Sequence, residues 1–218
     1  LPACRDFLKD LIAIKSLSAG EQQVVERIRD EMLAVGFDEV KFDGFGNVLG
    51  RVGDGPCVVA MDAHVDTVDA GDLDAWERDP WDPVERDGIL YGRGASDQKG
   101  GMAAMVYAGK LLKELNLLEG CQVWMVGSVQ EEDCDGLCWQ YILREKVIEP
   151  DVVVITEPTN LQLYRGHRGR MEMEVETKGL SCHGSAPERG VNAVYKMAPI
   201  VMGVEAMGKD FHEDPFLG

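Results

Sequence analysis

The stretch CVVAMDAHVD, residues 57–66, joins a short apolar run to an imidazole and a carboxylate, those of His64 and Asp66. Two further apolar runs, residues 121–129 and 152–156, lead in the same way into acidic residues. Short apolar runs bounded by turn residues are typical of buried parallel strands. In open α/β sheets, ligands bind at the carboxyl ends of such strands. The sequence therefore predicts an α/β fold in which these side chains meet at one edge of one sheet.

The residues that follow these runs have the chemistry of metal ligands. Imidazole and carboxylate together are the ligands of catalytic zinc, whereas structural zinc sites prefer cysteine. Carboxylates that can bridge favour two metal ions, and so many acidic groups at a buried edge would repel one another without cations. Each motif alone is common, and it is their joint order along the chain that indicates one site. The candidate residues are His64, Asp66, Asp97, Glu131, Glu132 and Glu157.

The overall composition is that of an ordinary globular protein with an acidic surface. The 218 residues are 45% hydrophobic and 28% charged, and the formal net charge is −17. Nucleic acid and anionic membranes bind basic faces, so neither is an expected partner. No apolar stretch approaches the length of a membrane span, and no secretory signal pattern opens the chain, which starts at Leu1 rather than at methionine.

The cysteines indicate a reducing environment. The chain has six cysteines, and they form neither a C-x-x-C pair nor the spacing of a disulfide framework. We therefore expect a cytoplasmic protein.

Periodicity and turn residues predict the remaining elements. Apolar residues at helical spacing, preceded by a Ser18–Glu21 capping box and followed by Gly36, predict a helix over residues 21–35. Asp87-Gly88 predicts a hairpin between Val84 and Tyr91. Further helices are expected over residues 3–14, 100–118 and 137–146, and a strand-turn-strand ribbon is expected to end near Arg51.

The pattern changes near residue 165, where we expect a domain boundary. Apolar and charged residues alternate over residues 171–178, which is typical of a strand with one face in water. A helix is expected over residues 192–207. We therefore expect residues 1–166 and residues 167–218 to belong to different domains.

Taken together, these motifs resemble the di-zinc amidohydrolases and exopeptidases, the family of acetylornithine deacetylase, succinyl-diaminopimelate desuccinylase, aminoacylase and glutamate carboxypeptidase. The segment VQEEDCDGLCW, residues 129–139, is similar more narrowly to the YgeY-type hydrolases linked to selenium metabolism. The matching blocks follow the family's order along nearly the whole chain. They are MDAHVDTV (61–68), GRGASDQKGG (92–101), QEE (130–132), TEPT (156–159), HGSAP (183–187) and GVNA (190–193).

The resemblance implies a ligand set for two divalent metal ions. His64 and Glu157 would bind one ion, Glu132 would bind the other, and Asp97 would bridge the two. Zinc is the expected metal, while oxygen-plus-histidine ligands leave cobalt and manganese open.

The resemblance also implies the catalytic roles. Glu131 would be the general base that takes a proton from the metal-bridging water, and Asp66 would orient His64. His183 would reach the active site of a partner subunit and polarise the scissile carbonyl, although composition alone favours an ordinary loop histidine there. Glu131 and Glu132 are adjacent, and only the family pattern divides the two roles between them.

The fold implied by the resemblance is a three-layer α/β/α di-zinc exopeptidase-like catalytic domain with an inserted α+β lid or dimerisation domain. Residues 1–166 would form the N-terminal portion of the first, and residues 167–218 would begin the lid, through which a homodimer is expected. In the family the chain then returns to the catalytic domain and supplies a last histidine ligand. That return is absent here, so we expect this chain to be a fragment.

The expected function is hydrolysis of an amide bond in a small N-acyl amino acid, dipeptide or related metabolite. The main alternative is a non-catalytic metal-binding or dimerisation protein of the same fold. The sequence identifies neither the acyl group nor the amine.

Overall fold

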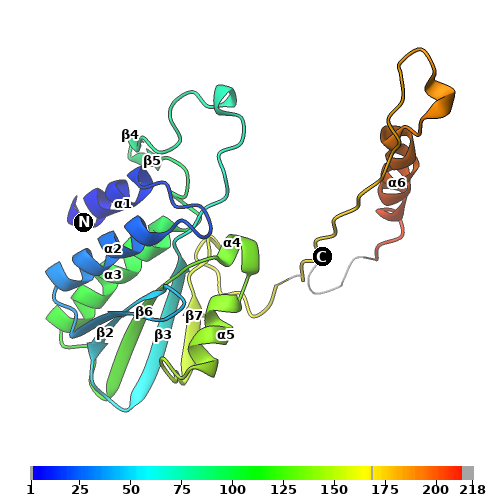
Figure 1. Cartoon of the computed structure of the whole chain (residues 1–218). Coiled ribbons are helices and arrows are strands. Elements are labelled where there is room, and N and C mark those ends of the chain that lie inside the picture. Colours follow the sequence, from blue (N-terminus) through cyan, green and yellow to red (C-terminus); the bar gives the residue numbers. More distant parts are fainter. Residues whose placement is uncertain (1, 168, 213–218) are drawn as a thin grey trace. The chain divides into compact units, whose positions relative to one another are not determined.

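The structure is a computed structural model in which residues 2–167 and 169–212 are described (Figure 1). The chain divides into two compact units, one running to Gln162 and the other starting at Leu163. This division lies close to the expected boundary at residue 166.

The first unit is built on a five-stranded mixed sheet with the order β1-β2-β6-β3-β7. Strands β6, β3 and β7 are parallel, while β2 and β1 continue the sheet antiparallel to β6. The carboxyl ends of the three parallel strands therefore lie at the same edge, as the sequence predicts. The strands are β1 (Glu39–Phe42), β2 (Val48–Gly53), β3 (Cys57–His64), β6 (Cys121–Ser128) and β7 (Val152–Ile155).

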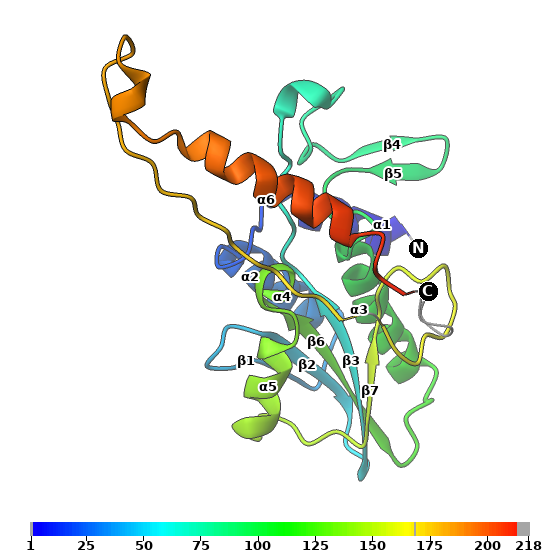
Figure 2. The same ribbon diagram turned by 90° about the vertical axis from the view of Figure 1, so that its right-hand side faces the viewer.

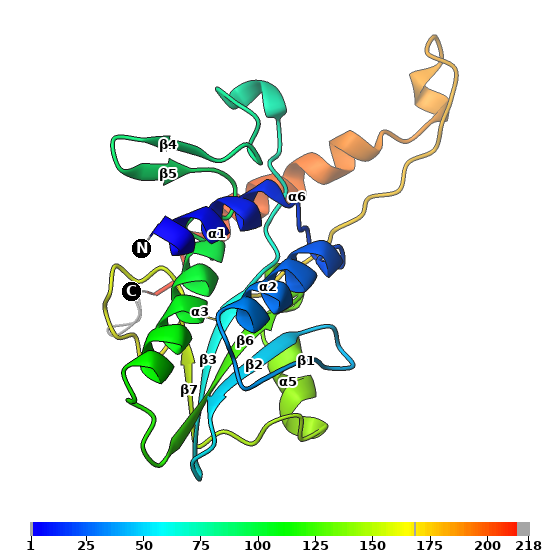
Figure 3. The same ribbon diagram turned by 90° about the vertical axis from the view of Figure 1, so that its left-hand side faces the viewer.

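Helices cover both faces of this sheet. Figure 3 views the face that is covered by α1, α2 and α3, and Figure 2 views the opposite face, on which α5 packs. The predicted three-layer α/β/α architecture is confirmed. The helices are α1 (Pro2–Ala13), α2 (Gln22–Ala34), α3 (Lys99–Glu114) and α5 (Leu137–Arg144), and a single turn, α4 (Glu131–Cys134), precedes α5.

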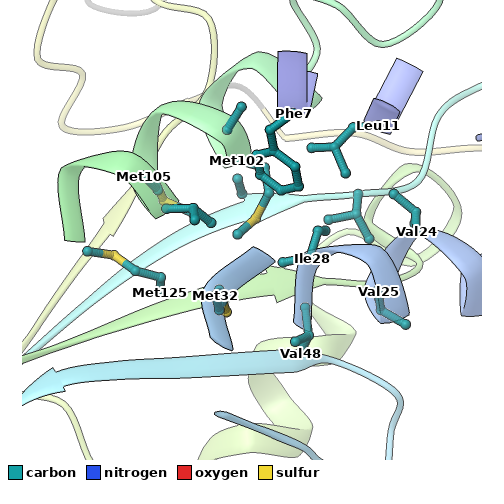
Figure 4. Close-up of a cluster of buried hydrophobic side chains, with 14 of the residues drawn as sticks. Phe7, Leu11, Val24, Val25, Ile28, Met32, Val48, Met102, Met105 and Met125 are labelled. Atoms are coloured by element: carbon teal, nitrogen blue, oxygen red, sulfur yellow. The ribbon is translucent and has the colours of Figure 1, made fainter. Parts of the chain in front are cut away.

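The larger hydrophobic core lies between the sheet and the three helices (Figure 4). On α2, Val24, Ile28 and Met32 recur every four residues and are fully buried, because this spacing keeps them on one face of the helix. They pack in one cluster with Val48 of β2 and Met125 of β6. Burying each such side chain contributes about 1.5–3 kcal/mol, so this face anchors α2 to the sheet.

The two ends of α2 differ in how well the sequence predicts them. At the C-terminus, Gly36 adopts a φ of +89°, and the N–H of Phe37 donates to the carbonyl of Met32 (3.0 Å), so the glycine C-cap is confirmed. At the N-terminus the predicted capping box is wrong. The cap residue is Glu21 and has no side-chain cap hydrogen bond. Both residues of the predicted box have other partners: the hydroxyl of Ser18 donates to Asp66, and the carboxylate of Glu21 accepts from the N–H of Gln130.

Strand β7 is parallel as predicted, but the expectation that it is buried is wrong. Val152, Val153, Val154 and Ile155 are each at least 40% exposed. The reason is its position, because β7 is the outermost strand of the sheet and pairs only with β3 in the described part of the chain.

A small hairpin in the first unit lies beside α1, where Glu85 forms ion pairs with Arg5 and Lys9. It pairs β4 (Val84–Arg86) with β5 (Ile89–Tyr91). Its turn places Asp87 and Gly88 at φ values of 53° and 77°, the left-handed conformation that such tight turns need. The predicted Asp-Gly hairpin is confirmed.

The second unit holds α6 (Ala193–Met207), close to its predicted range, and a short 3-10 turn at Pro187–Arg189. The strand predicted over residues 171–178 is wrong. This segment has no regular secondary structure, and Met171 and Met173 are 81% and 75% exposed. A segment of alternating apolar and charged residues forms a strand only where a second strand completes its backbone hydrogen bonds. In the described part of this unit the only strand-like pairing is an isolated bridge between Leu180 and Val191.

Within the described residues, no helix is both long and apolar enough to cross a membrane.

Candidate metal centre

His64, the last residue of β3, is the centre of the candidate site. Its side chain is almost fully buried, and its Nε2 atom lies 2.8 Å from Oδ1 of Asp97. Its Nδ1 atom lies 3.0 Å from the carbonyl oxygen of Asp66. A ring N–H that donates to a carbonyl fixes the tautomer in which the other nitrogen is available to a metal. Ligand atoms of His64, Asp97 and Glu132 all lie within 4.8 Å of one another.

The charges around His64 favour a cation at this position. Burial alone would lower the pKa of the imidazole, but hydrogen bonds to Asp66 and Asp97, together with the negative charges of Asp66 and Glu131, raise it to about 11. The same field of carboxylates would stabilise a divalent ion.

Asp66 ties the end of β3 to the acidic turn α4. Its carboxylate accepts hydrogen bonds from the backbone N–H groups of Glu131 (3.2 Å) and Glu132 (3.1 Å) and from the hydroxyl of Ser18 (2.7 Å). Burial would raise the pKa of Asp66, but the hydrogen bonds from His64 and Ser18 and the charge of His64 hold it below its usual value. The sequence predicted only that Asp66 orients His64. It revealed neither the hydrogen bond from Ser18 nor those from the backbone of α4.

This network predicts that Asp66→Asn weakens zinc binding by about 10–100-fold, the usual loss when a group that orients a metal ligand is removed. Ser18→Ala should act in the same direction but less, because it removes one of the donors to Asp66. A zinc competition titration against a chromophoric chelator measures both effects.

Ser16→Ala is the matched control, because the hydroxyl of Ser16 donates to the backbone carbonyl of Val65 rather than to Asp66. It should leave the zinc affinity unchanged. An Asp66→Asn protein with wild-type zinc affinity would contradict the positioning role.

Glu131 and Glu132 are presented by a strained turn. Gln130, which precedes them, adopts the left-handed conformation (φ 58°, ψ 34°), which is uncommon for a residue other than glycine. Its N–H donates to the buried carboxylate of Glu21 (2.9 Å). Oε2 of Glu131 lies 3.9 Å from Nε2 of His64. The two adjacent carboxylates therefore face one imidazole.

Burial raises the pKa values of Glu131 and Glu132 above the usual range, although the positive charge of His64 acts to lower them. Neighbouring carboxylates raise both values further. A glutamate whose pKa is raised is a stronger base than an exposed one, which suits a proton acceptor near neutral pH.

Glu157 lies close to the group but outside the set of ligand atoms that meet within 4.8 Å. Its Oε1 accepts a hydrogen bond from Nε2 of Gln98 (2.6 Å), and the Oε1 of Gln98 in turn accepts from the hydroxyl of Thr156 (2.9 Å). Burial is the main cause that raises the pKa of Glu157, and the charge of Asp97 adds to it. Sequence reasoning missed Gln98, although its place directly after Asp97 was a usable signal.

Asp97 lies two residues before α3, whose first residue is the buried Lys99. Nζ of Lys99 donates to the carbonyl oxygens of Leu11 (2.9 Å) and Ile14 (2.7 Å), at the C-terminal end of α1. Burial lowers the pKa of Lys99 to about 8. The hydrogen bond with His64 holds the pKa of Asp97 below its usual value.

A small cavity of about 190 Å³ opens beside these residues. Asp97 and Glu132 lie in its wall, and the loop at residues 92–96 forms most of the remainder together with Thr67 and Val68. Space for a small molecule therefore adjoins the candidate ligands.

His183 belongs to the second unit, where it is exposed. Its Nδ1 lies 2.8 Å from the hydroxyl of Ser185. In the same unit, Oδ1 of Asn192 accepts from the N–H of Val194 (2.9 Å), which makes Asn192 the N-cap of α6.

The donor atoms fit a catalytic metal ion. One imidazole nitrogen and several carboxylate oxygens, without a thiolate, are the ligands of hydrolytic zinc. The fold therefore places a group of side chains that can hold a divalent metal ion at the carboxyl edge of the sheet. Residues 60–208 match the sequence model of the peptidase family M20/M25/M40. The chain belongs to this family.

Two curated relatives cover almost the whole chain. The "Uncharacterized protein YgeY" of Escherichia coli (strain K12) is 54% identical over 212 residues, which are 97% of this chain and 53% of that protein. A Staphylococcus epidermidis protein named "Probable succinyl-diaminopimelate desuccinylase" is 34% identical over 95% of this chain and 52% of its own length. The chain thus spans about half the length of the curated relatives it matches.

A solved structure supports the fold. The Bacillus subtilis YXEP protein, described as a dinuclear metal binding peptidase from the M20 family, aligns with a TM-score of 0.53 at 18% identity. The alignment covers 71% of this chain and 42% of that one.

Proposed function

We propose that the full-length protein is a metal-dependent hydrolase that cleaves an amide bond in a small N-acyl amino acid or dipeptide. The observation that carries this proposal is the convergence of His64, Asp97 and Glu132, from three separate segments of the chain, whose ligand atoms lie within 4.8 Å of one another. Membership of a peptidase family and similarity to a protein named as a desuccinylase support an amide bond as the target.

We propose that two divalent ions, most simply zinc, complete the site. His64 and Glu157 would hold one ion and Glu132 the other, with Asp97 shared between them. When bound, such ions lower the pKa of water towards neutrality and polarise the substrate carbonyl. The similarity to the B. subtilis protein, a dinuclear metal binding peptidase, supports this number of ions.

In this proposal the residues of the chain divide the remaining work. The carboxylate of Glu131 accepts a proton from the attacking water and returns it to the nitrogen of the leaving amine. Its Oε2 lies 3.9 Å from Nε2 of His64, so the carboxylate is beside the proposed ligands, and the family resemblance assigns the ligand role to Glu132 instead. Asp66 fixes the imidazole of His64 and the backbone of α4, so that base and ligands keep their relative positions.

The second unit supplies the remaining roles. We propose that it is the start of a lid through which two subunits associate, and that His183 of the partner subunit stabilises the developing oxyanion. Removal of such a donor typically costs about 3–4 kcal/mol of transition-state stabilisation. The six free cysteines support a cytoplasmic location.

A panel of N-acyl amino acids and dipeptides, including N-succinyl compounds, tests the activity with the protein expressed at full length. We expect hydrolysis of at least one class, loss of that activity after dialysis against a chelator, and its recovery on addition of zinc, cobalt or manganese. Binding of stoichiometric metal without hydrolysis of any amide in the panel would instead support the non-catalytic alternative.

A further inference from the structure

Two cysteines face each other at the amino-terminal edge of the sheet, opposite to the candidate metal centre. Cys57 is the first residue of β3 and Cys121 is the first residue of β6, and the two are register partners in the parallel ladder. The N–H of Cys57 donates to the carbonyl of Gly120 (3.2 Å), directly before Cys121. Register partners on adjacent strands point to the same face of a sheet, so the two side chains lie side by side.

The two thiols are in close range of each other. A hydrogen bond with the thiol of Cys121 is the first cause that raises the pKa of Cys57, followed by the charge of Cys121, and the carboxylate of Asp151 adds a smaller contribution. Cys57 is exposed and Cys121 is partly exposed, so a small molecule in solution can reach the pair.

The backbone also holds these two strand starts together. The N–H of Gly55 donates to the carbonyl of Cys121 (3.1 Å). The two loops approach so closely that a Cβ atom on Gly55 would lie 2.1 Å from the carbonyl carbon of Gly120. Adjacent strands are about 4.7–4.9 Å apart, within the range of about 4.4–6.8 Å that separates the Cα atoms of a disulfide.

We propose that Cys57 and Cys121 are a reversible redox pair, which a low-molecular-weight disulfide such as oxidised glutathione converts to an intramolecular disulfide. The thiolate of Cys57, the more exposed residue, attacks one sulfur of the oxidant and releases one glutathione thiolate. The thiolate of Cys121 then attacks the Cys57 sulfur of the mixed disulfide and releases the second. Two electrons pass from the cysteines to the oxidant, and the two cysteine protons go to the released thiolates.

The disulfide would stabilise the fold without touching the candidate metal centre. Strand β3 separates Cys57 from His64 by seven residues, or about 23 Å at the usual rise of a strand. The bond would close the loop between residues 57 and 121, and closing a long loop restricts the unfolded chain. Oxidation should therefore raise Tm by several degrees and leave metal content unchanged.

Peptide mapping tests the proposal directly. The full-length protein is treated with oxidised glutathione at pH 8, its free thiols are alkylated, and it is digested without reduction for mass spectrometry. We expect the peptide that contains Cys57 joined to the peptide that contains Cys121, with loss of this species after reduction. The reaction should be faster at pH 9 than at pH 7, because thiolate is the attacking form.

The controls separate this pair from general thiol oxidation. Cys182→Ser, which removes an exposed cysteine of the second unit, should leave the cross-linked species in place. Cys121→Ser should abolish it and leave Cys57 as a glutathione adduct. A wild-type protein that accumulates the glutathione adduct on Cys57 without the cross-link, or that joins Cys57 mainly to another cysteine, would overturn the proposal.

Discussion

Replacing Glu131 with alanine should lower kcat for amide hydrolysis by about 10²–10⁴-fold, the usual contribution of a general base, while the metal content stays at the wild-type level. The physical reason is the position of this carboxylate. Its Oε2 lies 3.9 Å from Nε2 of His64, and the proposed ligands are His64, Asp97, Glu132 and Glu157 rather than Glu131. Its removal therefore takes away a proton acceptor and leaves the ligands in place.

Steady-state kinetics with a cleaved amide substrate, combined with elemental analysis of the same preparation, measures both halves of this prediction. Glu131→Gln should behave like the alanine variant, because an amide of the same shape cannot accept the proton. Asp133→Ala is the matched control on the same turn and should retain activity. Near wild-type turnover in Glu131→Ala would refute the role of base, and loss of metal from it would make Glu131 a ligand.

Replacing Asp97 with alanine should remove metal as well as activity. Asp97 contributes a carboxylate to the group within 4.8 Å and is hydrogen-bonded to His64. A shared carboxylate can supply one oxygen to each of two ions, so its loss weakens both positions at once. We expect the bound metal to fall from about two ions per chain to less than one.

Inductively coupled plasma analysis after exhaustive dialysis provides the metal count. Asp82→Ala, which removes an exposed acidic residue of the loop before the hairpin, controls for the loss of negative charge alone and should keep full metal content. Thermal unfolding of each variant checks that the fold is retained. If Asp97→Ala kept the wild-type number of ions, Asp97 would not be the shared ligand.

The sheet was predictable from the sequence because its strands carry their signals locally. Residues 57–61, 121–129 and 152–156 are short apolar runs, and a parallel arrangement places their ends at one edge. This reasoning located His64, Glu131 and Glu132 at that edge without knowledge of any pairwise contact. The α/β class and the common edge thus follow from element type and strand direction, whereas the three-layer architecture was implied by the family resemblance.

Contacts between distant segments were not predictable in the same way. Ser18 has the spacing of a capping box with Glu21, yet its hydroxyl donates to Asp66, 48 residues away. The spacing of neighbouring residues could not reveal that Asp66 competes for the hydroxyl of Ser18. The alternating segment at residues 171–178 predicts a strand, but a strand requires a partner that the pattern itself does not contain.

The exposure of β7 has the same origin. Its four apolar residues resemble those of β3 and β6 in composition, and only the strand order places β7 at the end of the sheet. Composition indicates that a segment is a strand, whereas its position in the sheet decides how far it is buried.

Anomalous diffraction at the zinc absorption edge, on crystals of the full-length protein grown with zinc, tests the central claim most directly. We predict two zinc peaks beside the ligand atoms of His64, Asp97 and Glu132, with the carboxylate of Asp97 between them and Glu157 beside the ion that His64 binds. An anomalous map with no zinc peak among these residues, while zinc is bound elsewhere on the protein, would contradict the account.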